Sequence, residues 1–347
     1  MTIYFVNIEV GEEDFFGKAL NEYDMVSVRR LADVDPDAEM VSVFIDERVD
    51  DGFLSAHPSL RFIATRSTSL DHVDLASCAS RGVVVANVPA YGEESVAEHT
   101  FALMLALARR LRELMETPAS GSFSYEATRG FELYGKNLGI IGMGQIGQRV
   151  AKLAHAFEMQ VLAYDVAKPE HLAETVGFRW VSLDELLATA DIISLHASLT
   201  KATYHILDRA RLTKTKPGVI VINTARGSLI DTGALRDALE SGHVAGAGLD
   251  VLQDERLLRQ HASEIIASDI LQHLRSDAVA QEDRDAERLN ELRELMLGDA
   301  LLAKPNVVFT PHVAFNTREA VARMCEVTAA NIRAFVEGRP ENLVNVR

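Results

Sequence analysis

Short apolar runs separated by amphipathic, helix-like stretches dominate the first hundred residues. Such runs, rich in β-branched residues and bounded by turn-forming residues, predict strands, and the longer stretches between them predict helices. Regular alternation of the two is typical of an α/β unit built on a parallel sheet. The four predicted strands cover residues 3–8, 40–45, 60–65 and 83–86.

A longer helical pattern then divides the chain. Over 93–115 apolar residues recur at helical spacing without a helix breaker, which predicts one helix long enough to connect two domains. From Asn137 the alternation resumes in the pattern of a doubly wound sheet. Ser182 with Glu185 predicts a capping box, and Asp231 predicts the N-cap of a later helix. The predicted strands of this half are 138–142, 160–165, 178–181, 191–196, 219–223, 244–250 and 306–310.

Composition narrows the class of protein. The 347 residues carry a formal net charge of -16, which argues against nucleic acid or anionic membranes as partners, because both reward clustered Lys and Arg. The two cysteines, Cys78 and Cys325, lie far apart, which argues against a disulfide framework or a metal cluster. We see no secretory signal pattern, and the longest apolar stretch, 100–108, is too short to cross a membrane. We therefore expect a cytoplasmic enzyme.

A glycine motif lies in the middle of the chain. It follows a predicted strand, opens a predicted helix, and is followed by a second strand that ends in Asp165. Glycine triplets also occur in tight turns that bind nothing, but this context is that of a dinucleotide-binding unit. We expect its glycines, with Gln145 and Ile146, to bind the cofactor. The motif reads Gly142-Met143-Gly144-Gln145-Ile146-Gly147.

Each part of the motif has a chemical role in such a unit. Gly142 allows the tight turn, Gly144 lets the backbone approach a pyrophosphate, and Gly147 lets the helix pack closely on the strand. The free N–H groups and partial positive charge of the helix N-terminus favour the diphosphate. Asp165 accepts hydrogen bonds from the ribose hydroxyls and repels a 2′-phosphate, so the sequence predicts NAD rather than NADP. The nearest basic residue after it is Lys168.

Polar residues follow the predicted strands of the second half, at the sheet edge where doubly wound folds bind ligands. Arginine binds a carboxylate and polarises a carbonyl, histidine passes a proton, and a carboxylate beside a histidine raises its pKa. These are the groups that hydride transfer on a hydroxy acid requires. Each also has an ordinary alternative as a surface charge or loop residue, and His196 is open to a loop or a cofactor role. The residues are His196-Ala197, Thr224-Ala225-Arg226, Asp250, Glu255 and His312.

Several motifs occur in a fixed order along the chain. They are RSTSLDHVD at 66–74, NVPAY at 87–91, VAEH at 96–99, the glycine motif, NTARG at 223–227, GAGLDV at 246–251 and NVVFTPH at 306–312. Together they resemble the D-isomer-specific 2-hydroxyacid dehydrogenases across essentially the whole chain. A set of ordered motifs is far more specific than any one of them.

The pattern and the resemblance predict an α/β protein with two doubly wound parallel-sheet domains. A Rossmann NAD-binding domain at 99–317 is inserted in a flavodoxin-like substrate domain made of 1–98 and 318–347. A long helix over 317–337 packs back on the first domain. We interpret the charged, helical stretch at about 256–303 as a solvated insertion, with an oligomer contact or a lid as the alternative.

The resemblance also implies roles for matching residues in the second domain. Arg226 binds the substrate carboxylate and carbonyl, and His312 is the general acid and base. Glu255 is the carboxylate partner of His312, although the inserted stretch lengthens the spacing between them. The nicotinamide end of the cofactor is held by Asp250 and the Thr224-Ala225 backbone.

Three residues of the first domain are implied to contact the substrate carboxylate: Thr68, Ser69 and Tyr91. The acid then lies in a cleft between domains that close over it. Ser69 stands where the family has glycine, so either this loop differs or the serine is held with strain at φ > 0. Glu158 likewise replaces a usual helix-ending glycine, and Ser198 replaces a proline beside the cofactor.

The resulting prediction is an NAD-dependent oxidoreductase that interconverts a small 2-oxo acid and its D-2-hydroxy acid, as a homodimer. Tyr91 and the residues after His312 are closest to the D-lactate dehydrogenase-like branch, which favours an acid such as pyruvate. Two alternatives stay open. One is the same fold acting on glyoxylate, hydroxypyruvate or a phosphorylated acid, and the other is a non-catalytic NAD(H)-sensing regulatory protein.

Overall fold

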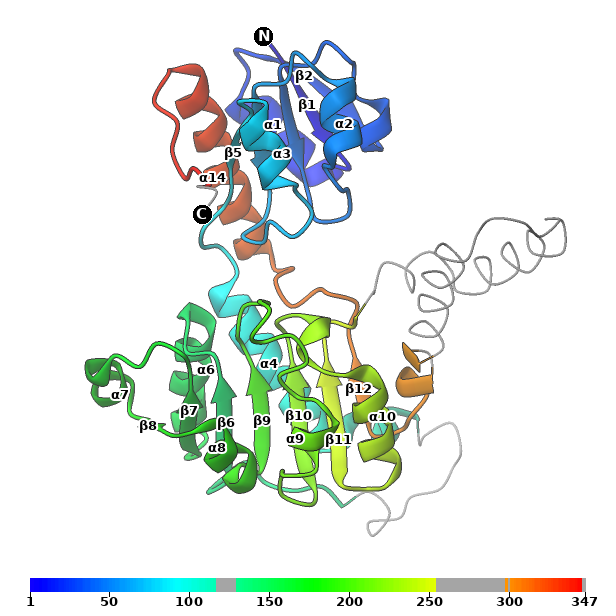
Figure 1. Cartoon of the computed structure of the whole chain (residues 1–347), viewed down its shortest axis with the longest axis vertical. Coiled ribbons are helices and arrows are strands. Elements are labelled where there is room, and N and C mark those ends of the chain that lie inside the picture. Colours follow the sequence, from blue (N-terminus) through cyan, green and yellow to red (C-terminus); the bar gives the residue numbers. More distant parts are fainter. Residues whose placement is uncertain (117–128, 254–296, 299, 345–347) are drawn as a thin grey trace, which may run out of the picture. The chain divides into compact units, whose positions relative to one another are not determined.

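The computed structural model describes residues 1–116, 129–253, 297–298 and 300–344, which form two compact units. Unit 1 is Met1–Gly92 with Asn316–Arg347, and unit 2 is Glu93–Phe315. Each is a parallel sheet flanked by helices (Figure 1), so the predicted class with two doubly wound sheets is confirmed. Most of the insertion predicted at 256–303 lies outside the described residues.

Unit 1 has five parallel strands in the order β2-β1-β3-β4-β5, which is the flavodoxin-like order. Strands β3 and β4 are buried along their whole length, as central strands of a parallel sheet are when helices cover both faces. The strands are β1 (Thr2–Val6), β2 (Asp24–Val28), β3 (Met40–Val43), β4 (Phe62–Thr65) and β5 (Val84–Ala86). The helices are α1 (Val10–Ala19), η1 (Leu31–Asp33), α2 (Asp51–Ala56), α3 (Leu75–Ser80) and α14 (Arg318–Val336).

The C-terminal part of the chain completes unit 1. Helix α14, orange to red in Figure 1, packs on α1 and β4, and the ring of Phe335 stacks on that of Phe62 with 4.2 Å between centroids. After α14 the chain pairs antiparallel with the edge strand β5 through Leu343 and Ala86. Segments from both ends of the sequence therefore build one sheet with its covering helix.

Unit 2 has seven parallel strands in the order β12-β11-β10-β9-β6-β7-β8, the Rossmann order with one further strand. Alternate residues of a strand serve opposite faces: Ile192 packs with the cluster that includes α4 and α6, and Ile193 with the cluster that includes α8 and α10. The strands are β6 (Asn137–Ile141), β7 (Gln160–Tyr164), β8 (Arg179–Trp180), β9 (Ile192–Leu195), β10 (Val219–Asn223), β11 (Val244–Leu249) and β12 (Val307–Phe309). The helices are α4 (Glu93–Ala108), α5 (Leu111–Glu116), α6 (Gln145–Ala156), α7 (Glu170–Val176), α8 (Leu183–Thr189), α9 (Arg209–Leu212), η3 (Gly227–Leu229) and α10 (Thr232–Glu240).

The single long helix predicted at 93–115 is wrong. The chain forms α4 and α5 with a break between them, where Arg110 adopts a left-handed φ of 50°. The guanidinium of Arg110 forms an ion pair with Glu113, within the first turn of α5. The sequence has neither glycine nor proline at this break, and the helical spacing of apolar residues continues across it. The pattern of apolar residues therefore predicts one helix where the structure has two.

Helix starts follow the predicted caps in part. Asp231 caps α10 by accepting a hydrogen bond from the Ala234 N–H at 2.9 Å. Ser182 caps α8 by accepting from the Glu185 N–H at 3.1 Å, but the Glu185 carboxylate bonds to Arg179 at 2.6 Å. The bond from the Glu185 N–H to the Ser182 hydroxyl, one half of the capping box, is therefore present. The Glu185 carboxylate, which the other half requires, instead forms a salt bridge with Arg179.

Helix α6 ends in a residue whose conformation normally belongs to glycine. Glu158 has a φ of 54°, and its N–H donates to the His155 carbonyl at 2.9 Å. The next N–H, of Met159, reaches back to the Ala154 carbonyl at 3.1 Å. These two bonds form a Schellman motif, in which the left-handed position favours glycine because it has no Cβ.

Replacing Glu158 by glycine is expected to raise the free energy of unfolding by about 1 kcal/mol, since a side chain in the left-handed region costs roughly that much. Chemical denaturation can follow this through the fluorescence of Trp180, the one tryptophan of the chain. Glu158→Ala is the matched control, because it removes the carboxylate and keeps the strained Cβ. Equal stabilisation by alanine would attribute the gain to charge and refute the conformational argument.

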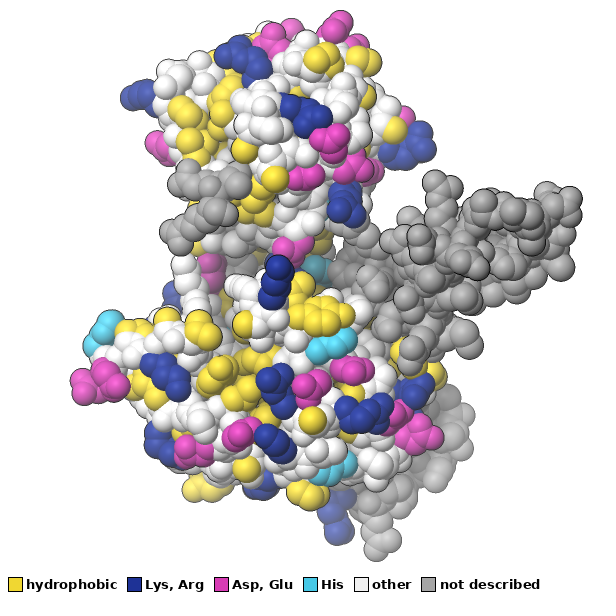
Figure 2. All heavy atoms as spheres, viewed as in Figure 1, with side chains coloured by type: hydrophobic (Ala, Val, Ile, Leu, Met, Phe, Trp, Pro, Cys, Tyr) yellow, Lys and Arg dark blue, Asp and Glu magenta, His cyan; other side chains and the backbone are white. Residues whose placement is uncertain are grey.

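Charged side chains of both signs are mixed over the surface. On the face shown in Figure 2, Lys and Arg lie among Asp and Glu of the described residues rather than in one cluster. Within the described ranges, no helix combines the length and the apolar character needed to span a membrane. The surface thus offers no single-sign field on this face for a polyanion.

Candidate functional site

The three glycines of the motif meet three different spatial demands. Gly142 has a φ of 100°, and a Cβ built on it would lie 2.4 Å from the Ala197 nitrogen, so a side chain there is excluded twice. A Cβ on Gly147 would lie 2.2 Å from the Gly142 carbonyl oxygen, which keeps α6 close to the turn. A Cβ on Gly144 would have no atom within 4 Å. The space beside Gly144 is therefore open.

This open space lies at the N-terminus of α6. Gly144 is the N-cap residue and supplies no side-chain cap, so the first-turn N–H groups, including those of Gln145 and Ile146, have no intrahelical acceptor. Such groups and the helix dipole together favour a phosphate anion. The geometry of the turn fits the pyrophosphate of a dinucleotide.

Asp165 follows β7 and is bonded to the glycine turn. One carboxylate oxygen accepts from the Met143 N–H at 2.8 Å, and the other accepts from the Ala167 N–H at 3.1 Å. The Lys168 ammonium donates to the Val181 carbonyl at 3.1 Å and lies 5.4 Å from the centre of the Tyr164 ring. The nearest lysine is therefore held by other groups, and Asp165 leaves a negative charge at this strand end.

His196 and Ala197 follow β9, directly against the glycine turn. The ring of His196 lies 2.8 Å from the Ser194 hydroxyl through Nε2. Loss of hydration on burial lowers the pKa of His196 to about 3, so the ring is neutral at neutral pH. A neutral ring suits a hydrogen bond or packing contact to the cofactor and does not suit proton transfer.

The loop after β10 is fixed by a buried amide. Asn223, 1% exposed, accepts from the Ala225 N–H at 3.0 Å and donates to the Arg226 carbonyl at 2.8 Å. The Thr224 hydroxyl lies 3.0 Å from that of Thr100 on α4. These bonds hold the backbone of the predicted cofactor-binding pair Thr224-Ala225 and position Arg226, whose side chain is half-buried.

A glycine brings the next loop against this one. A Cβ on Gly227 would lie 1.9 Å from the Leu252 carbonyl carbon, so only glycine permits the approach of the chain that follows β11. The Arg226 guanidinium donates to its neighbour's carbonyl, that of Ala225, at 2.7 Å. The loops after two adjacent strands are thus in direct backbone contact.

Asp250, at the end of β11, is a buried carboxylate that binds the loop after β12. It is 1% exposed and accepts from the Thr310 hydroxyl at 2.6 Å and from the N–H groups of Val313 and Ala314 at 3.0 Å each. Its carbonyl oxygen accepts from the His312 N–H at 2.7 Å. The sequence predicts a contact to the nicotinamide end for Asp250, and its role as the anchor of this loop was not predicted.

His312 lies in that anchored loop with a φ of 55°. A non-glycine residue in the left-handed region costs about 1–2 kcal/mol and persists where the surroundings over-determine it. The hydrogen bonds from the N–H groups of His312, Val313 and Ala314 to Asp250 hold the backbone in this conformation. They set the Cα–Cβ direction of the histidine predicted to transfer the proton.

His99 on α4 is a residue of this site that the sequence did not predict. Its Nε2 lies 2.8 Å from the Thr310 hydroxyl and 3.6 Å from the Asp250 carboxylate. The motif VAEH at 96–99 contains this histidine and gives no indication of its partners. Glu255, the predicted partner of His312, lies outside the described residues, so that assignment stays a prediction.

The predicted substrate loop in unit 1 is held without strain. Ser69 is not among the described residues with a left-handed φ, so the glycine of the family is replaced here without the conformational cost that we considered. Its hydroxyl donates to the Asp71 carboxylate at 2.8 Å, and the Ser67 hydroxyl donates to the Ser69 carbonyl at 2.7 Å. Within the described residues, the N–H groups of Thr68 and Ser69 donate no hydrogen bond. They are available to a carboxylate.

Tyr91 lies near the end of the first segment of unit 1. It is 8% exposed, and its carbonyl oxygen accepts two bonds from the Arg323 guanidinium of α14, at 2.9 and 2.7 Å. The backbone at Tyr91 is therefore fixed to the C-terminal helix. Its predicted contact with the substrate carboxylate is not tested by these bonds.

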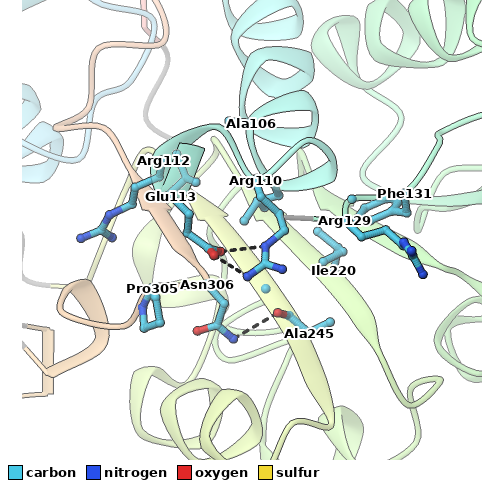
Figure 3. Close-up of a pocket in the computed structure, with 14 residues that line it drawn as sticks. Ala106, Arg110, Arg112, Glu113, Arg129, Phe131, Ile220, Ala245, Pro305 and Asn306 are labelled. Atoms are coloured by element: carbon cyan, nitrogen blue, oxygen red, sulfur yellow. Dashed lines mark hydrogen bonds and ion pairs between the residues drawn. The ribbon is translucent and has the colours of Figure 1, made fainter. Parts of the chain in front are cut away.

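A cavity of about 220 Å³ lies away from all of these residues (Figure 3). It is lined by the α4–α5 break, with the Arg110–Glu113 pair, and by the starts of β10 and β11 at Ile220 and Ala245. Those are the amino ends of parallel strands, whereas doubly wound sheets bind ligands at the carboxyl ends. We therefore assign the chemistry to the strand-end loops and not to this cavity.

Comparison with known proteins agrees with this geometry. Residues 101–314 match the family model described as D-isomer specific 2-hydroxyacid dehydrogenase, NAD binding domain. A 2-hydroxyacid dehydrogenase homolog of Haemophilus influenzae is 35% identical over 336 residues, or 95% of this chain and 91% of that protein. Glyoxylate reductase of Korarchaeum cryptofilum is 34% identical over 92% of this chain and 85% of its own length.

A solved structure extends the match to the fold of nearly the whole chain. The D-lactate dehydrogenase from Aquifex aeolicus, complexed with NAD and lactic acid, aligns with a TM-score of 0.82 at 36% identity, covering 97% of this chain and 96% of that one. The matched family model names NAD binding over the residues that form the open glycine turn. The protein therefore belongs to the D-isomer specific 2-hydroxyacid dehydrogenase family, the members of which are NAD-dependent oxidoreductases.

Proposed function

We propose that the protein reduces a small 2-oxo acid to its D-2-hydroxy acid, and catalyses the reverse oxidation, with His312 and Arg226 as its catalytic residues. One observation carries the proposal. The loop that presents His312 is tied to the buried Asp250 after β11, and the adjacent loop after β10 presents Arg226. A proton donor and a carboxylate-binding cation thus follow strands that are separated by one strand of a single sheet.

The chemistry divides between these two groups. NADH, when bound at the glycine turn, supplies the hydride. Arg226 binds the substrate carboxylate with its planar fork of N–H donors, and its charge polarises the adjacent carbonyl. Protonated His312 donates its proton to the carbonyl oxygen as the alcohol forms, and neutral His312 takes that proton back in the oxidation. Glu255, as its predicted partner, would favour the protonated form.

The remaining substrate contacts are proposed for unit 1. The N–H groups of Thr68 and Ser69, which donate no hydrogen bond within the described part of the chain, are suitable donors to the substrate carboxylate. Tyr91 is proposed as a further contact because its backbone is fixed by Arg323. The homodimer and the cytoplasmic location stay predictions.

Pyruvate is the substrate that we propose first. The solved D-lactate dehydrogenase, which is 36% identical to this chain, was determined in complex with lactic acid. The motif at Tyr91 also resembles the D-lactate dehydrogenase-like branch. The relative named glyoxylate reductase makes glyoxylate the first competitor. NADH oxidation should be measured with pyruvate, glyoxylate, hydroxypyruvate and a phosphorylated 2-oxo acid, with chiral analysis of every product except glycolate, which has no stereocentre. Turnover of none of them, or an L-configured product, would overturn the proposal.

Changing Asp165 to asparagine is expected to relax the preference for NAD over NADP by roughly tenfold to a hundredfold in the ratio of kcat/KM values, because the charge that repels a 2′-phosphate is removed. Asp165 accepts from two backbone N–H groups through its two separate oxygens, and the single amide oxygen of asparagine can still accept from one of them. Lys168→Gln is the matched control. The Lys168 ammonium is bound to the Val181 carbonyl, so its removal should leave the ratio of kcat/KM values for NAD and NADP unchanged. An unaltered ratio in Asp165→Asn would contradict the ribose assignment.

A further inference from the structure

A chain of three asparagines links the C-terminal tail to the substrate loop of unit 1. Asn342, after α14, donates its amide to the Asn331 side-chain oxygen at 2.7 Å. Asn331, on α14, donates to the Asn87 carbonyl at 2.8 Å, and Asn87 donates its side-chain amide to the Thr68 carbonyl at 2.9 Å. Each bond is at normal hydrogen-bond length.

Asn331, the middle asparagine of the three, is buried and uses its side-chain amide in hydrogen bonds. Asn331 is 1% exposed on the buried, mostly apolar face of α14, which also includes Thr328 and Ile332. An asparagine amide in such a place costs free energy unless donor and acceptor are both used, and here both are. Its position on α14 is therefore explained by what it holds rather than by packing alone.

The tail is shaped to take part in this chain of bonds. Asn342 has a φ of 51°, a conformation that asparagine tolerates better than most residues. Its carbonyl accepts from the Asn87 N–H at 3.2 Å, next to the antiparallel pair of Ala86 and Leu343. Backbone and side chain of Asn342 thus fix the same residue, Asn87, directly and through Asn331.

The last link orients a peptide group that matters for substrate binding. A peptide bond is planar and trans, so its C=O and N–H point in opposite directions. Because the Thr68 carbonyl is held by Asn87, the N–H of Ser69 in the same peptide is directed away from Asn87. That N–H donates no hydrogen bond within the described residues. A second contact, from the Thr68 hydroxyl to the Val88 carbonyl at 2.7 Å, fixes the same residue.

We propose that Asn331 is a positioning residue for substrate: through Asn87 it sets the direction of the Ser69 N–H that receives the substrate carboxylate, and the tail residue Asn342 holds Asn331 in place. This inference rests on the proposed function, since it requires a carboxylate-bearing substrate at this loop. It assigns a role in substrate binding to the C-terminal tail and to a helix that carries no predicted site residue.

The test separates substrate binding from stability. Asn331→Leu, close to asparagine in shape, removes both bonds, and we expect KM for the 2-oxo acid to rise about tenfold while kcat and KM for NADH stay unchanged. Thr328→Val is the matched control, because Thr328 is fully buried on the same helix and bonds only to the Met324 carbonyl within α14. Equal KM increases in both variants would indicate general destabilisation and overturn the inference.

Two further measurements keep the result decisive. Asn342→Gly keeps the left-handed backbone and removes the amide, so it should raise KM in the same direction even if Asn331→Leu folds poorly. Hydrogen exchange without substrate should be faster in both asparagine variants at the N–H groups of Asn87 and Val88, which donate to the Asn342 and Ser67 carbonyls. Unchanged exchange together with unchanged KM would refute the role of Asn331. If the unaltered protein turns over no 2-oxo acid, the proposed function fails, whereas the exchange experiment still decides whether the asparagines hold the loop.

Discussion

Replacing His312 by asparagine is expected to lower kcat for 2-oxo acid reduction by about 10²–10⁴, the usual contribution of a general acid–base residue. Asparagine is the informative replacement because His312 has a φ of 55°, which asparagine adopts at low cost. The loop bonds to Asp250 come from backbone N–H groups and the Thr310 hydroxyl, and none of them involves the His312 side chain, so they persist in the variant. The effect can therefore be assigned to the imidazole.

Two measurements complete this experiment. NADH affinity, from fluorescence titration, should be unchanged, and so should the melting temperature. An unchanged kcat would contradict the proposed role. His312→Ala should lose the same activity with an added loss of stability, because alanine is strained in the left-handed region.

Replacing Arg226 by alanine is expected to lower kcat/KM for the 2-oxo acid by about 10²–10⁴, because two charge-assisted hydrogen bonds of roughly 1.5–3 kcal/mol each are lost. Arg226→Lys should recover only a small part, since an ammonium lacks the planar fork that matches a carboxylate. NADH should still bind, because the variant loses the guanidinium bond to the Ala225 carbonyl but keeps the two bonds by which Asn223 holds this loop, to the Ala225 N–H and the Arg226 carbonyl. Steady-state kinetics with both substrates varied will separate these effects.

The control for Arg226 lies in the same unit. Arg209→Ala removes a guanidinium from an exposed pair with Asp237, and kcat/KM should not change. If Arg226→Ala abolishes NADH binding, Arg226 belongs to the cofactor site and the substrate carboxylate has another partner. Partial rescue of the alanine variant by free guanidinium ion would support the proposed contact.

Most of the sheet was predictable from hydrophobic runs, and β2 is the exception. Its residues Met25-Val26-Ser27-Val28 have the same sequence as β3, Met40–Val43, yet β2 has no buried residue whereas β3 is buried throughout. Side-chain polarity therefore does not distinguish this edge strand, which is placed by its backbone pairing with β1, from a central one. The break at Arg110 was missed because the apolar spacing continues across a turn that a local ion pair accompanies.

The candidate site was predictable where a motif fixes backbone geometry. The glycines at 142, 144 and 147 can be interpreted directly, because the left-handed turn at Gly142 and the start of α6 are local features, even though the space at Gly142 is also closed by the distant Ala197. Asp250 could be placed at a strand end, but its bonds to the loop of His312 join residues some sixty positions apart. His99 and Asn331 act through similarly distant partners. Sequence patterns describe neighbours along the chain, and these contacts are set by how the strands and helices are ordered in the fold.

The division of unit 1 between the two ends of the sequence has a consequence for the protein's synthesis. Chains fold from the N-terminus as they leave the ribosome. β1 to β5 therefore emerge long before α14. The face of β4 that carries Phe62 stays uncovered by Phe335 until all of unit 2 has been synthesised. Such delayed long-range contacts slow folding and expose apolar surface to aggregation. A chain released before α14 would carry a complete dinucleotide-binding unit beside an uncovered sheet, and would be a substrate for chaperones or proteolysis rather than a working enzyme.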